Sequence, residues 1–241
     1  MILLFTDFGA EGPYVGQVEA AIHQICPEHR VINLVSNAPS TEPRLGAYLL
    51  AALARSFPRG SIFLCVVDPG VGGQRLPVVL EADDRWFVGP DNGLLNSVAV
   101  QAGEVRWRQI EWRPENLSNS FHGRDLFAPV AARIARRDFA WTTGLTKGPD
   151  LAAWPADIAA IIYFDHYGNA VTGCRYGYDW EGKTLLINGR RLQQAGTFCD
   201  VPEGQAFWYC NSMGLIEIAA NRGRAQDCLT LSLGMGFRFD E

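Results

Sequence analysis

The residues best suited to chemistry stand at the end of an apolar run. Residues 61–67 are followed by Asp68 and then by a loop of one proline and three glycines that leads to Arg75. This is the pattern of a buried strand that ends at one edge of a sheet, where α/β proteins place their active sites. The glycines allow a positive φ or a close backbone approach to a ligand. Asp68 and Arg75 are placed to pair across the loop, either as a structural ion pair or as part of a site.

Further acids and amides stand where other predicted elements end. Asp7 follows the first apolar run, Asp165 and Asn169 share a later turn, and residues 211–212 follow another strand-like run. A carboxylate can accept hydrogen bonds from both hydroxyls of a ribose, and asparagine offers the donor and acceptor that an adenine edge requires. Each residue alone is also a common turn former or helix cap. The hypothesis of a site therefore depends on their joint placement.

One of the four histidines has a chemically suggestive neighbourhood. His122 lies in Phe121-His122-Gly123-Arg124-Asp125 at the predicted start of a helix. The sequence has no phosphate-binding G-x-x-x-x-G-K-[ST] loop, no G-x-G-x-x-G after the first strand and no G-x-S-x-G nucleophile elbow. The common nucleotide-binding and serine-hydrolase motifs are thus excluded.

The elements that position these residues form two predicted domains. Residues 1–140 alternate apolar runs with segments of helical period, which predicts an α/β domain with a mostly parallel sheet. A hairpin is expected around residues 82–84, where two short apolar runs flank Ala-Asp-Asp. Residues 141–157 are rich in Gly, Pro and Trp and are interpreted as a linker, whereas residues 158–241 hold short β-like runs separated by turns. They predict a smaller, all-β, barrel-like domain.

Composition restricts the partners. The chain of 241 residues has 48% apolar and 20% charged residues and a net charge of −5 without a basic block. Nucleic acid is therefore not an expected partner, and no apolar stretch is long enough to span a membrane. Six cysteines show neither a C-x-x-C pair nor zinc-ligand spacing, and the first residues lack a signal-peptide pattern. These features favour a soluble cytoplasmic protein.

Taken together, the motifs resemble those of the S-adenosyl-L-methionine (SAM) hydrolases, or SAM hydroxide adenosyltransferases, which are related to fluorinase and chlorinase. The resemblance spans nearly the whole chain in unbroken order. The matching blocks are Thr6-Asp7-Phe8-Gly9, Tyr14-Val15-Gly16, residues 67–72, residues 89–94, residues 121–125, residues 127–132, Asp165 with Gly168-Asn169, and Asn211-Ser212 with Gly214 and residues 217–219.

The resemblance implies an activity and a catalytic set. It implies hydrolysis of SAM to adenosine and L-methionine by attack of water or hydroxide at C5′ of the ribose, without metal or cofactor. The catalytic residues would be Asp68, Arg75 and His122. Gly123 occupies the place of the halide-binding serine of fluorinase, which also favours the hydrolase. A homotrimer with sites at subunit interfaces is implied as well.

The same resemblance assigns the substrate-binding residues. Asp7 would hold the ribose diol, Asn169 the adenine, and Asp165 and Ser212 the methionine end. The remaining residues assigned to substrate binding are Phe8, Tyr167, Phe198, Asn211 and Glu217.

Three departures from the family pattern keep other functions open. Gly12 replaces an acid, Gly173 replaces a common asparagine, and residues 36–39 lack a frequent histidine. A SAM-binding sensor without turnover is one alternative. A metal-dependent phosphoesterase is another, and its ligands would be Asp7, Asp68, His122 and Asp125. A halogenating enzyme is the least favoured.

Overall fold

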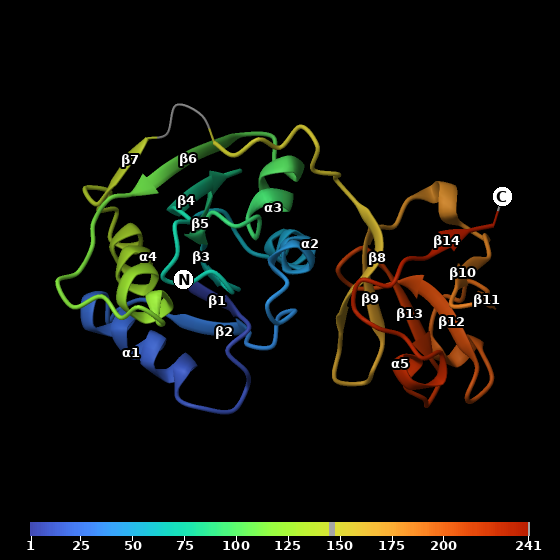
Figure 1. The fold of residues 1–241 in the computed structure, drawn as a ribbon. Coiled ribbons are helices and arrows are strands. Elements are labelled where there is room, and N and C mark those ends of the chain that lie inside the picture. Colours follow the sequence, from blue (N-terminus) through green and yellow to red (C-terminus); the bar gives the residue numbers. More distant parts are fainter. Residues whose placement is uncertain (145–147, 241) are drawn as a thin grey trace. The chain divides into compact units, whose positions relative to one another are not determined.

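The computed structural model describes residues 1–144 and 148–240, which divide into two compact units, Met1–Trp154 and Pro155–Glu241 (Figure 1). Among the described residues, no helix is both long enough and apolar enough to cross a bilayer.

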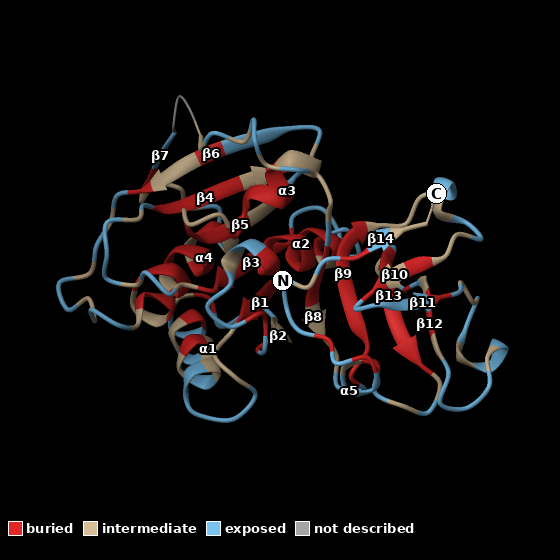
Figure 2. Ribbon diagram, turned by 45° about the vertical axis from the view of Figure 1, so that its right-hand side comes forward, coloured by how far each residue is buried: buried red, intermediate tan, exposed pale blue. Residues whose placement is uncertain are grey.

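The first unit is built on a seven-stranded sheet with the strand order β2-β1-β3-β5-β4-β6-β7. Its inner strands β1 and β3 are buried along their whole length, as Figure 2 shows. Continuous apolar strands of this kind need cover on both faces of the sheet. The strands are β1 (Ile2–Thr6), β2 (Val31–Val35), β3 (Ile62–Val66), β4 (Pro77–Ala82), β5 (Arg85–Pro90), β6 (Val105–Ile110) and β7 (Thr142–Gly144).

The sheet is mixed rather than mostly parallel, which corrects the sequence-based prediction. Strands β2, β1, β3 and β5 are parallel neighbours, but β4, β6 and β7 are added in antiparallel pairs. The cause is the predicted hairpin. Asp83 and Asp84 both have positive φ, of 47° and 61°, and reverse the chain between β4 and β5. Because β4 then runs against β5, the strands that join beyond it alternate in direction.

Helices cover both faces of this sheet. Helices α1 (Tyr14–Ile25) and α4 (Ala128–Ala135) pack on one face against alternate residues of β1 and β3. Helix α2 (Pro43–Ala54) packs on the other, where a Cβ at Gly46 would lie 3.7 Å from the Phe5 ring. Helix α3 (Asn96–Gln101) lies beside α2, and a π-helix, η1 (Gly123–Phe127), leads directly into α4. The packed helices leave the strand ends free to carry polar loops.

The second unit holds two antiparallel sheets, with the orders β12-β13-β9-β8 and β11-β10-β14. Trp208 is fully buried in its core. The pairings among the described residues give two separate sheets, and the predicted barrel-like closure stays a prediction. The strands are β8 (Ile158–Phe164), β9 (Ala170–Arg175), β10 (Leu185–Ile187), β11 (Arg190–Leu192), β12 (Ala206–Cys210), β13 (Leu215–Ala220) and β14 (Arg238–Phe239); the helical turns are η2 (Tyr178–Trp180), η3 (Phe198–Asp200) and α5 (Ala225–Cys228).

Part of the segment interpreted as a linker belongs to the first unit. It includes β7, and Trp154 stacks on Tyr48 with ring centroids 6.2 Å apart and donates its indole N–H to Ser97 Oγ at 3.0 Å. Trp154 is therefore packed on the first unit, immediately before the second unit begins.

Candidate active site

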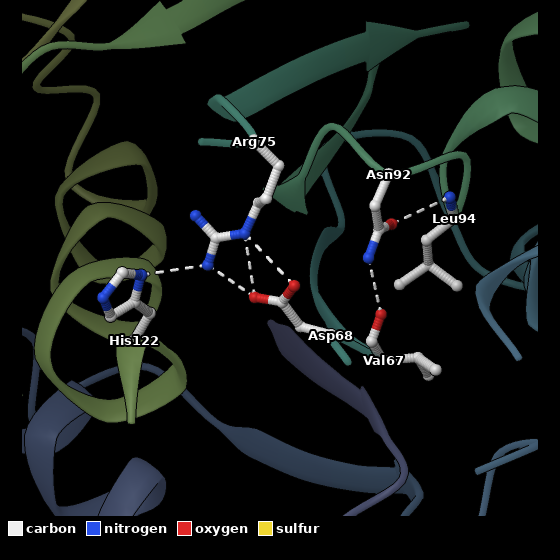
Figure 3. Close-up of polar contacts among 6 residues, drawn as sticks. All are labelled: Val67, Asp68, Arg75, Asn92, Leu94 and His122. Atoms are coloured by element: carbon white, nitrogen blue, oxygen red, sulfur yellow. Dashed lines mark hydrogen bonds and ion pairs between the residues drawn. The ribbon is translucent and has the colours of Figure 1, made fainter. Parts of the chain in front are cut away.

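Asp68, Arg75 and His122 meet beyond the C-terminal end of β3 (Figure 3). Arg75 Nε donates to Asp68 Oδ1 at 3.1 Å and to Oδ2 at 2.9 Å, and Nη2 donates to Oδ2 at 2.5 Å. The same Nη2 lies 2.9 Å from His122 Nδ1. The Arg75 and Asp68 side chains are only 10% and 3% exposed. The structure thus brings the three residues predicted to be catalytic into one nearly buried chain of hydrogen bonds.

The position of Asp68 is fixed by the neighbouring turn. Asn92, just beyond β5, donates from Nδ2 to the carbonyl of Val67 at 2.8 Å and accepts the Leu94 N–H on Oδ1 at 3.2 Å (Figure 3). This side chain joins the end of β3 to the loop after β5. The hydrogen bond from Asn92 therefore fixes the backbone of Val67, the residue immediately before Asp68.

The loop that delivers Arg75 depends on a glycine at position 72. Gly72 has φ +79°, and a Cβ there would lie 2.6 Å from the carbonyl oxygen of Asn119. The loop itself is closed by hydrogen bonds from Val71 N to Asp68 O and from Gly73 N to Gly70 O. Close packing against Asn119 places the loop beside the segment that leads to His122.

His122 is held in its neutral form. Burial lowers the pKa of the imidazole most, and the charges of Arg75 and Arg113 lower it further, against the opposing effect of Asp68 and Asp125. Arg113 is itself fixed by donating to the carbonyls of Ile110 and Trp112 at 2.8 and 2.9 Å. Since the pKa lies below the usual histidine value, His122 is uncharged at neutral pH.

Asp7 and Phe8 follow β1 in the same unit. Asp7 Oδ2 accepts the Thr41 N–H at 3.1 Å. Phe8 meets Phe121 edge to face, with centroids 5.6 Å apart, and a Cβ at Gly123 would lie 2.9 Å from Phe8 Cζ. A side chain at position 123 would therefore have to displace Phe8, which makes this glycine a packing requirement next to His122.

The second unit contains a cavity of about 740 Å³. Four residues that the sequence assigned to substrate binding line it: Asp165, Tyr167, Asn169 and Phe198. It is also lined by residues outside that assignment: His166, Tyr209, Ala220, Asn221, Arg222, Gly223 and Arg224.

Asn169 lines this cavity and has a buried acceptor that finds no partner in the described part of the chain. Its backbone N–H and its Nδ2 donate to the two oxygens of Asp165, at 2.8 and 2.9 Å. Asn169 is only 4% exposed, and among the described residues its buried Oδ1 has no hydrogen-bond partner. A buried polar atom without a partner costs free energy. Asn169 Oδ1 is thus the one polar atom of this side chain that the protein leaves unpaired among the described residues.

Glu217 lies behind the cavity wall rather than in its lining. Its carboxylate accepts the Tyr209 hydroxyl at 2.6 Å and Asn211 Nδ2 at 2.8 Å. Burial raises the pKa of Glu217 in spite of these two hydrogen bonds. Asn211 Oδ1 in turn accepts the N–H groups of Met213 and Leu215, so it orders the turn that carries the exposed Ser212.

Comparison with protein-family models decides the family. The model of the SAM hydroxide adenosyltransferase N-terminal domain matches residues 2–142, and the model of its C-terminal domain matches residues 159–238. The chain belongs to the SAM hydroxide adenosyltransferase family. The two matched regions lie one in each structural unit.

Individual relatives cover almost all of the chain. It is 35% identical to the (R)-S-adenosyl-L-methionine hydrolase of Thermus thermophilus, over 98% of each chain, and 33% identical to that of Salinispora arenicola, over 95% of this chain and 93% of the relative. A fluorinase of Nocardia brasiliensis is 23% identical, over 92% and 90%. A solved structure of a conserved protein from Thermotoga maritima superposes with a TM-score of 0.89 at 29% identity, over 100% of both chains.

Two departures from the family pattern have a local structural context. Gly173 lies in β9, where a Cβ would overlap Ile158 Cγ2 and lie 3.0 Å from Ile162 Cγ2, so the common asparagine has no room in this packing. Gly12 has φ +112°, a conformation that would strain an acidic side chain.

Two of the three carboxylates of the phosphoesterase hypothesis, Asp68 and Asp125, are paired with arginines. Arg75 donates to both oxygens of Asp68. Arg124 Nε donates to Asp125 Oδ1 at 2.6 Å, and the Ser118 N–H donates to Asp125 Oδ2 at 3.0 Å. Within residues 1–144 and 148–240, no group of three His, Cys, Asp or Glu residues is arranged to hold a metal ion. The guanidinium groups beside Asp68 and Asp125 repel a cation, whereas the third carboxylate of the set, Asp7, accepts the Thr41 N–H.

Three contributors were missed from the sequence. Tyr209 lies in β12, whose run of apolar and aromatic residues gives no sign of a cavity. Arg113 lies in a stretch without hydrophobic periodicity. Asn92 lies in the matching block of residues 89–94 but was given no role of its own. Asn92 bonds to Val67, which is 25 positions away, and Arg113 acts on His122 through its charge, so no local signal identifies these two. Tyr209 bonds to Glu217 of the neighbouring strand β13.

The Gly72 packing gives a first prediction. We expect Gly72→Ala to lower the free energy of unfolding more than Gly60→Ala, and to lower turnover, because only position 72 has both positive φ and a backbone oxygen in the way. Gly60 has φ +80° with nothing within 4 Å of its Cβ and is the matched control. The conformational strain costs about 1–2 kcal/mol in each variant, and overpacking adds roughly 1–3 kcal/mol at position 72. Urea unfolding and turnover assays test this; equal effects of the two variants would contradict it.

Proposed function

We propose that this chain hydrolyses SAM to adenosine and L-methionine. The hydrogen-bonded set of Asp68, Arg75 and His122 carries the proposal. Support also comes from the named SAM hydrolases that are 33–35% identical over nearly the whole chain. Asp68, Arg75 and His122 act as the catalytic residues in this proposal, and the nucleophile attacks C5′ of the ribose.

The chemistry that the protein must supply is limited. The sulfonium of SAM already makes methionine a good, neutral leaving group, so no acid is needed to expel it. What remains is to hold a nucleophilic oxygen in line with the C5′–S bond, and such positioning removes much of a barrier. A guanidinium that is always charged can stabilise hydroxide character on that oxygen. No metal or cofactor takes part in this scheme.

Two residues that line the cavity of the second unit are proposed to bind parts of SAM: Asn169 would contact the adenine, and Asp165 the methionine end. Outside that lining, Asp7 of the first unit would contact the ribose diol, and Ser212 the methionine end. Phe8, Tyr167 and Phe198 would supply apolar and aromatic contacts. Asn211 and Glu217 complete the proposed binding set.

The unused Asn169 Oδ1 leads to a second prediction. The exocyclic amino group of adenine is a donor that this oxygen can accept, as asparagine does when it reads adenine. We expect Asn169→Ala to raise the dissociation constant for SAM about five- to thirtyfold, in line with roughly 1–2 kcal/mol for one hydrogen bond. We expect turnover of bound SAM to change far less. Calorimetric titration and saturation kinetics test this, and an unchanged dissociation constant would contradict it.

We also propose that the active form is a homotrimer whose sites lie at subunit interfaces, and that it works in the cytoplasm. Family membership supports the trimer. Light scattering coupled to size-exclusion chromatography is expected to give a mass near three times the 26.6 kDa of one chain. A monomeric, fully active protein would contradict the interface sites.

The function is tested by incubating the purified protein with SAM in the presence of EDTA and separating the products. Adenosine and methionine should appear together in equal amounts and at a rate that EDTA does not change. Binding of SAM without product would favour the sensor, and loss of activity in EDTA would favour a metal enzyme. A chloride-dependent chlorinated nucleoside would identify a halogenase.

A further inference from the structure

One buried carboxylate, that of Glu217 in β13, is bound by both Tyr209 and Asn211. Glu217 is 5% exposed and lies directly opposite Tyr209 in the antiparallel pair of β12 and β13. Its Oε1 accepts the Tyr209 hydroxyl at 2.6 Å, and its Oε2 accepts a hydrogen from Asn211 Nδ2 at 2.8 Å. Each oxygen of this carboxylate therefore has a different partner.

The direction of the Asn211 hydrogen bond is fixed by the turn that follows it. Asn211 Oδ1 accepts the N–H groups of Met213 and Leu215 at 2.9 and 3.0 Å, so the amide cannot turn over without losing both bonds. Nδ2 then faces Glu217, and an amide NH₂ group can only donate. Oε2 of Glu217 must remain an acceptor, and a proton taken up by this carboxylate must lie on Oε1, the oxygen that faces Tyr209.

The hydrogen of Tyr209 can be placed by the same reasoning. Burial and the hydrogen bond to Glu217 raise the pKa of the Tyr209 phenol, so it keeps its hydrogen at neutral pH. While Glu217 is a carboxylate, this hydrogen is given to Oε1, and the phenol oxygen of this cavity-lining residue has only lone pairs left for a ligand. When Glu217 is protonated, Oε1 donates instead, and the Tyr209 hydrogen is released. One proton thus reverses what Tyr209 offers to a ligand.

The acidic groups beside this pair are held by neutral donors. Asp165 lines the cavity and accepts the backbone N–H and the Nδ2 hydrogen of Asn169 at 2.8 and 2.9 Å. Burial raises the pKa of Glu217 most, and the charge of Asp165 raises it further, against the hydrogen bonds from Tyr209 and Asn211. Carboxylates that have only neutral donors are suited to a positively charged N–H group of a ligand.

The other neighbours of Glu217 add no charge to the pair. Val171 lies opposite Glu217 in β9, and Cys210, next to Tyr209, has a thiol whose pKa is raised by burial, which leaves it uncharged at neutral pH. Helix α5 also packs on β13, and its Asp227 is paired with an arginine at 3.0 Å.

We propose that Glu217 is a positioning residue for the amino-acid end of the substrate. As a carboxylate it holds the hydrogen of Tyr209, so that the phenol oxygen accepts a hydrogen from the α-ammonium group of the ligand. Protonation of Glu217 reverses this hydrogen bond and weakens binding of the ammonium group. The choice of ligand rests on the proposed function; the directions of the hydrogen bonds do not.

Two thioethers of adenosine separate the amino-acid end from the rest of the ligand. S-adenosyl-L-homocysteine carries this end, 5′-methylthioadenosine lacks it, and neither has the sulfonium that makes SAM reactive. On a change from pH 8 to pH 5 we expect the dissociation constant of the homocysteine compound to rise roughly three- to tenfold, the usual worth of one hydrogen bond. The dissociation constant of methylthioadenosine should stay constant. Calorimetric titration of the wild-type protein measures both.

Glu217→Gln imitates the protonated state. Asn211 requires an acceptor, so the glutamine oxygen should face it and the glutamine NH₂ should donate to Tyr209. We expect weakened binding of the homocysteine compound already at pH 8, without further loss at pH 5. In a Tyr209→Phe background the same substitution should change the dissociation constant by less than about twofold, because the hydroxyl that it turns is absent.

Equal pH dependence in the wild type and in Glu217→Gln would overturn this role, as would equal effects of Glu217→Gln with and without the Tyr209 hydroxyl. A protein that binds neither thioether would overturn it too. If Glu217→Gln does not fold, Tyr209→Phe alone decides, since it should lose most of the pH dependence and full retention contradicts the proposal. If SAM is not hydrolysed while the thioethers bind as expected, the proposed function fails and the positioning role stands.

Discussion

Arg75→Ala is expected to lower kcat/KM for SAM by roughly a hundred- to a thousandfold, the usual effect of removing one donor that stabilises a reacting oxygen. Arg75 is the central member of the set, since it contacts Asp68 and His122 at once. Binding of SAM should change by less than about threefold. Steady-state kinetics and calorimetric titration of the same preparation measure the two effects separately.

Two controls separate catalysis from folding in this experiment. Arg75→Ala leaves a buried Asp68 carboxylate without its partner, which destabilises a protein by about 3–5 kcal/mol. The double variant Asp68→Asn, Arg75→Gln removes the charge together with the guanidinium, and it should fold while remaining inactive. Arg106, whose side chain is 72% exposed, provides a matched control: Arg106→Ala should retain turnover. Full activity of Arg75→Ala would contradict a role of this residue in holding the nucleophile.

His122→Ala is expected to lower kcat by about a hundredfold, and His122→Gln is expected to recover part of that loss. Glutamine offers both an acceptor for Arg75 Nη2 and an N–H donor, but it cannot carry a proton as histidine does. The partial recovery therefore follows if His122 positions by hydrogen bonding. A His122→Gln variant as inactive as His122→Ala, yet equally stable, would instead indicate proton transfer by His122, which contributes about 10²–10⁴-fold in other enzymes. Comparison of kcat with the thermal unfolding midpoint of each variant decides between the two.

The sequence predicted the positions of the candidate catalytic residues better than it predicted the directions of the strands in the sheet. Asp68 does follow a buried strand and a glycine loop does lead to Arg75, as the apolar run and the loop composition predicted. The sequence predicted a mostly parallel sheet, whereas β4, β6 and β7 pair in antiparallel fashion. An apolar run shows that a strand is buried but does not show the direction in which it runs beside its neighbour. The hairpin at residues 83–84 was predicted, but not its effect on the strands that join after it.

The meeting of His122 with Arg75 was implied by the family resemblance alone. The two residues are 47 positions apart, and the loop that carries Arg75 packs at Gly72 against Asn119, close to His122 in the chain. Local patterns carry no information on such a contact. The same holds for Glu217, whose place in an alternating strand gives no sign that its carboxylate is bound to Tyr209 and Asn211.

The Gly123 packing bears on the choice between hydrolysis and halogenation. A serine here, which the family resemblance associates with halide binding, would place its Cβ 2.9 Å from Phe8 Cζ and would disturb the packing of Phe8 beside His122. This packing and the Asp68–Arg75–His122 set support the same proposal, that the nucleophile is an oxygen from solvent.

The central claim, attack of a solvent-derived oxygen on C5′, is tested most directly by turnover in ¹⁸O-labelled water followed by mass spectrometry of both products. The proposed function predicts one ¹⁸O atom in adenosine, located on the 5′ oxygen, and none in methionine. Unlabelled adenosine, or a label that appears only in another product, would contradict attack by solvent at C5′.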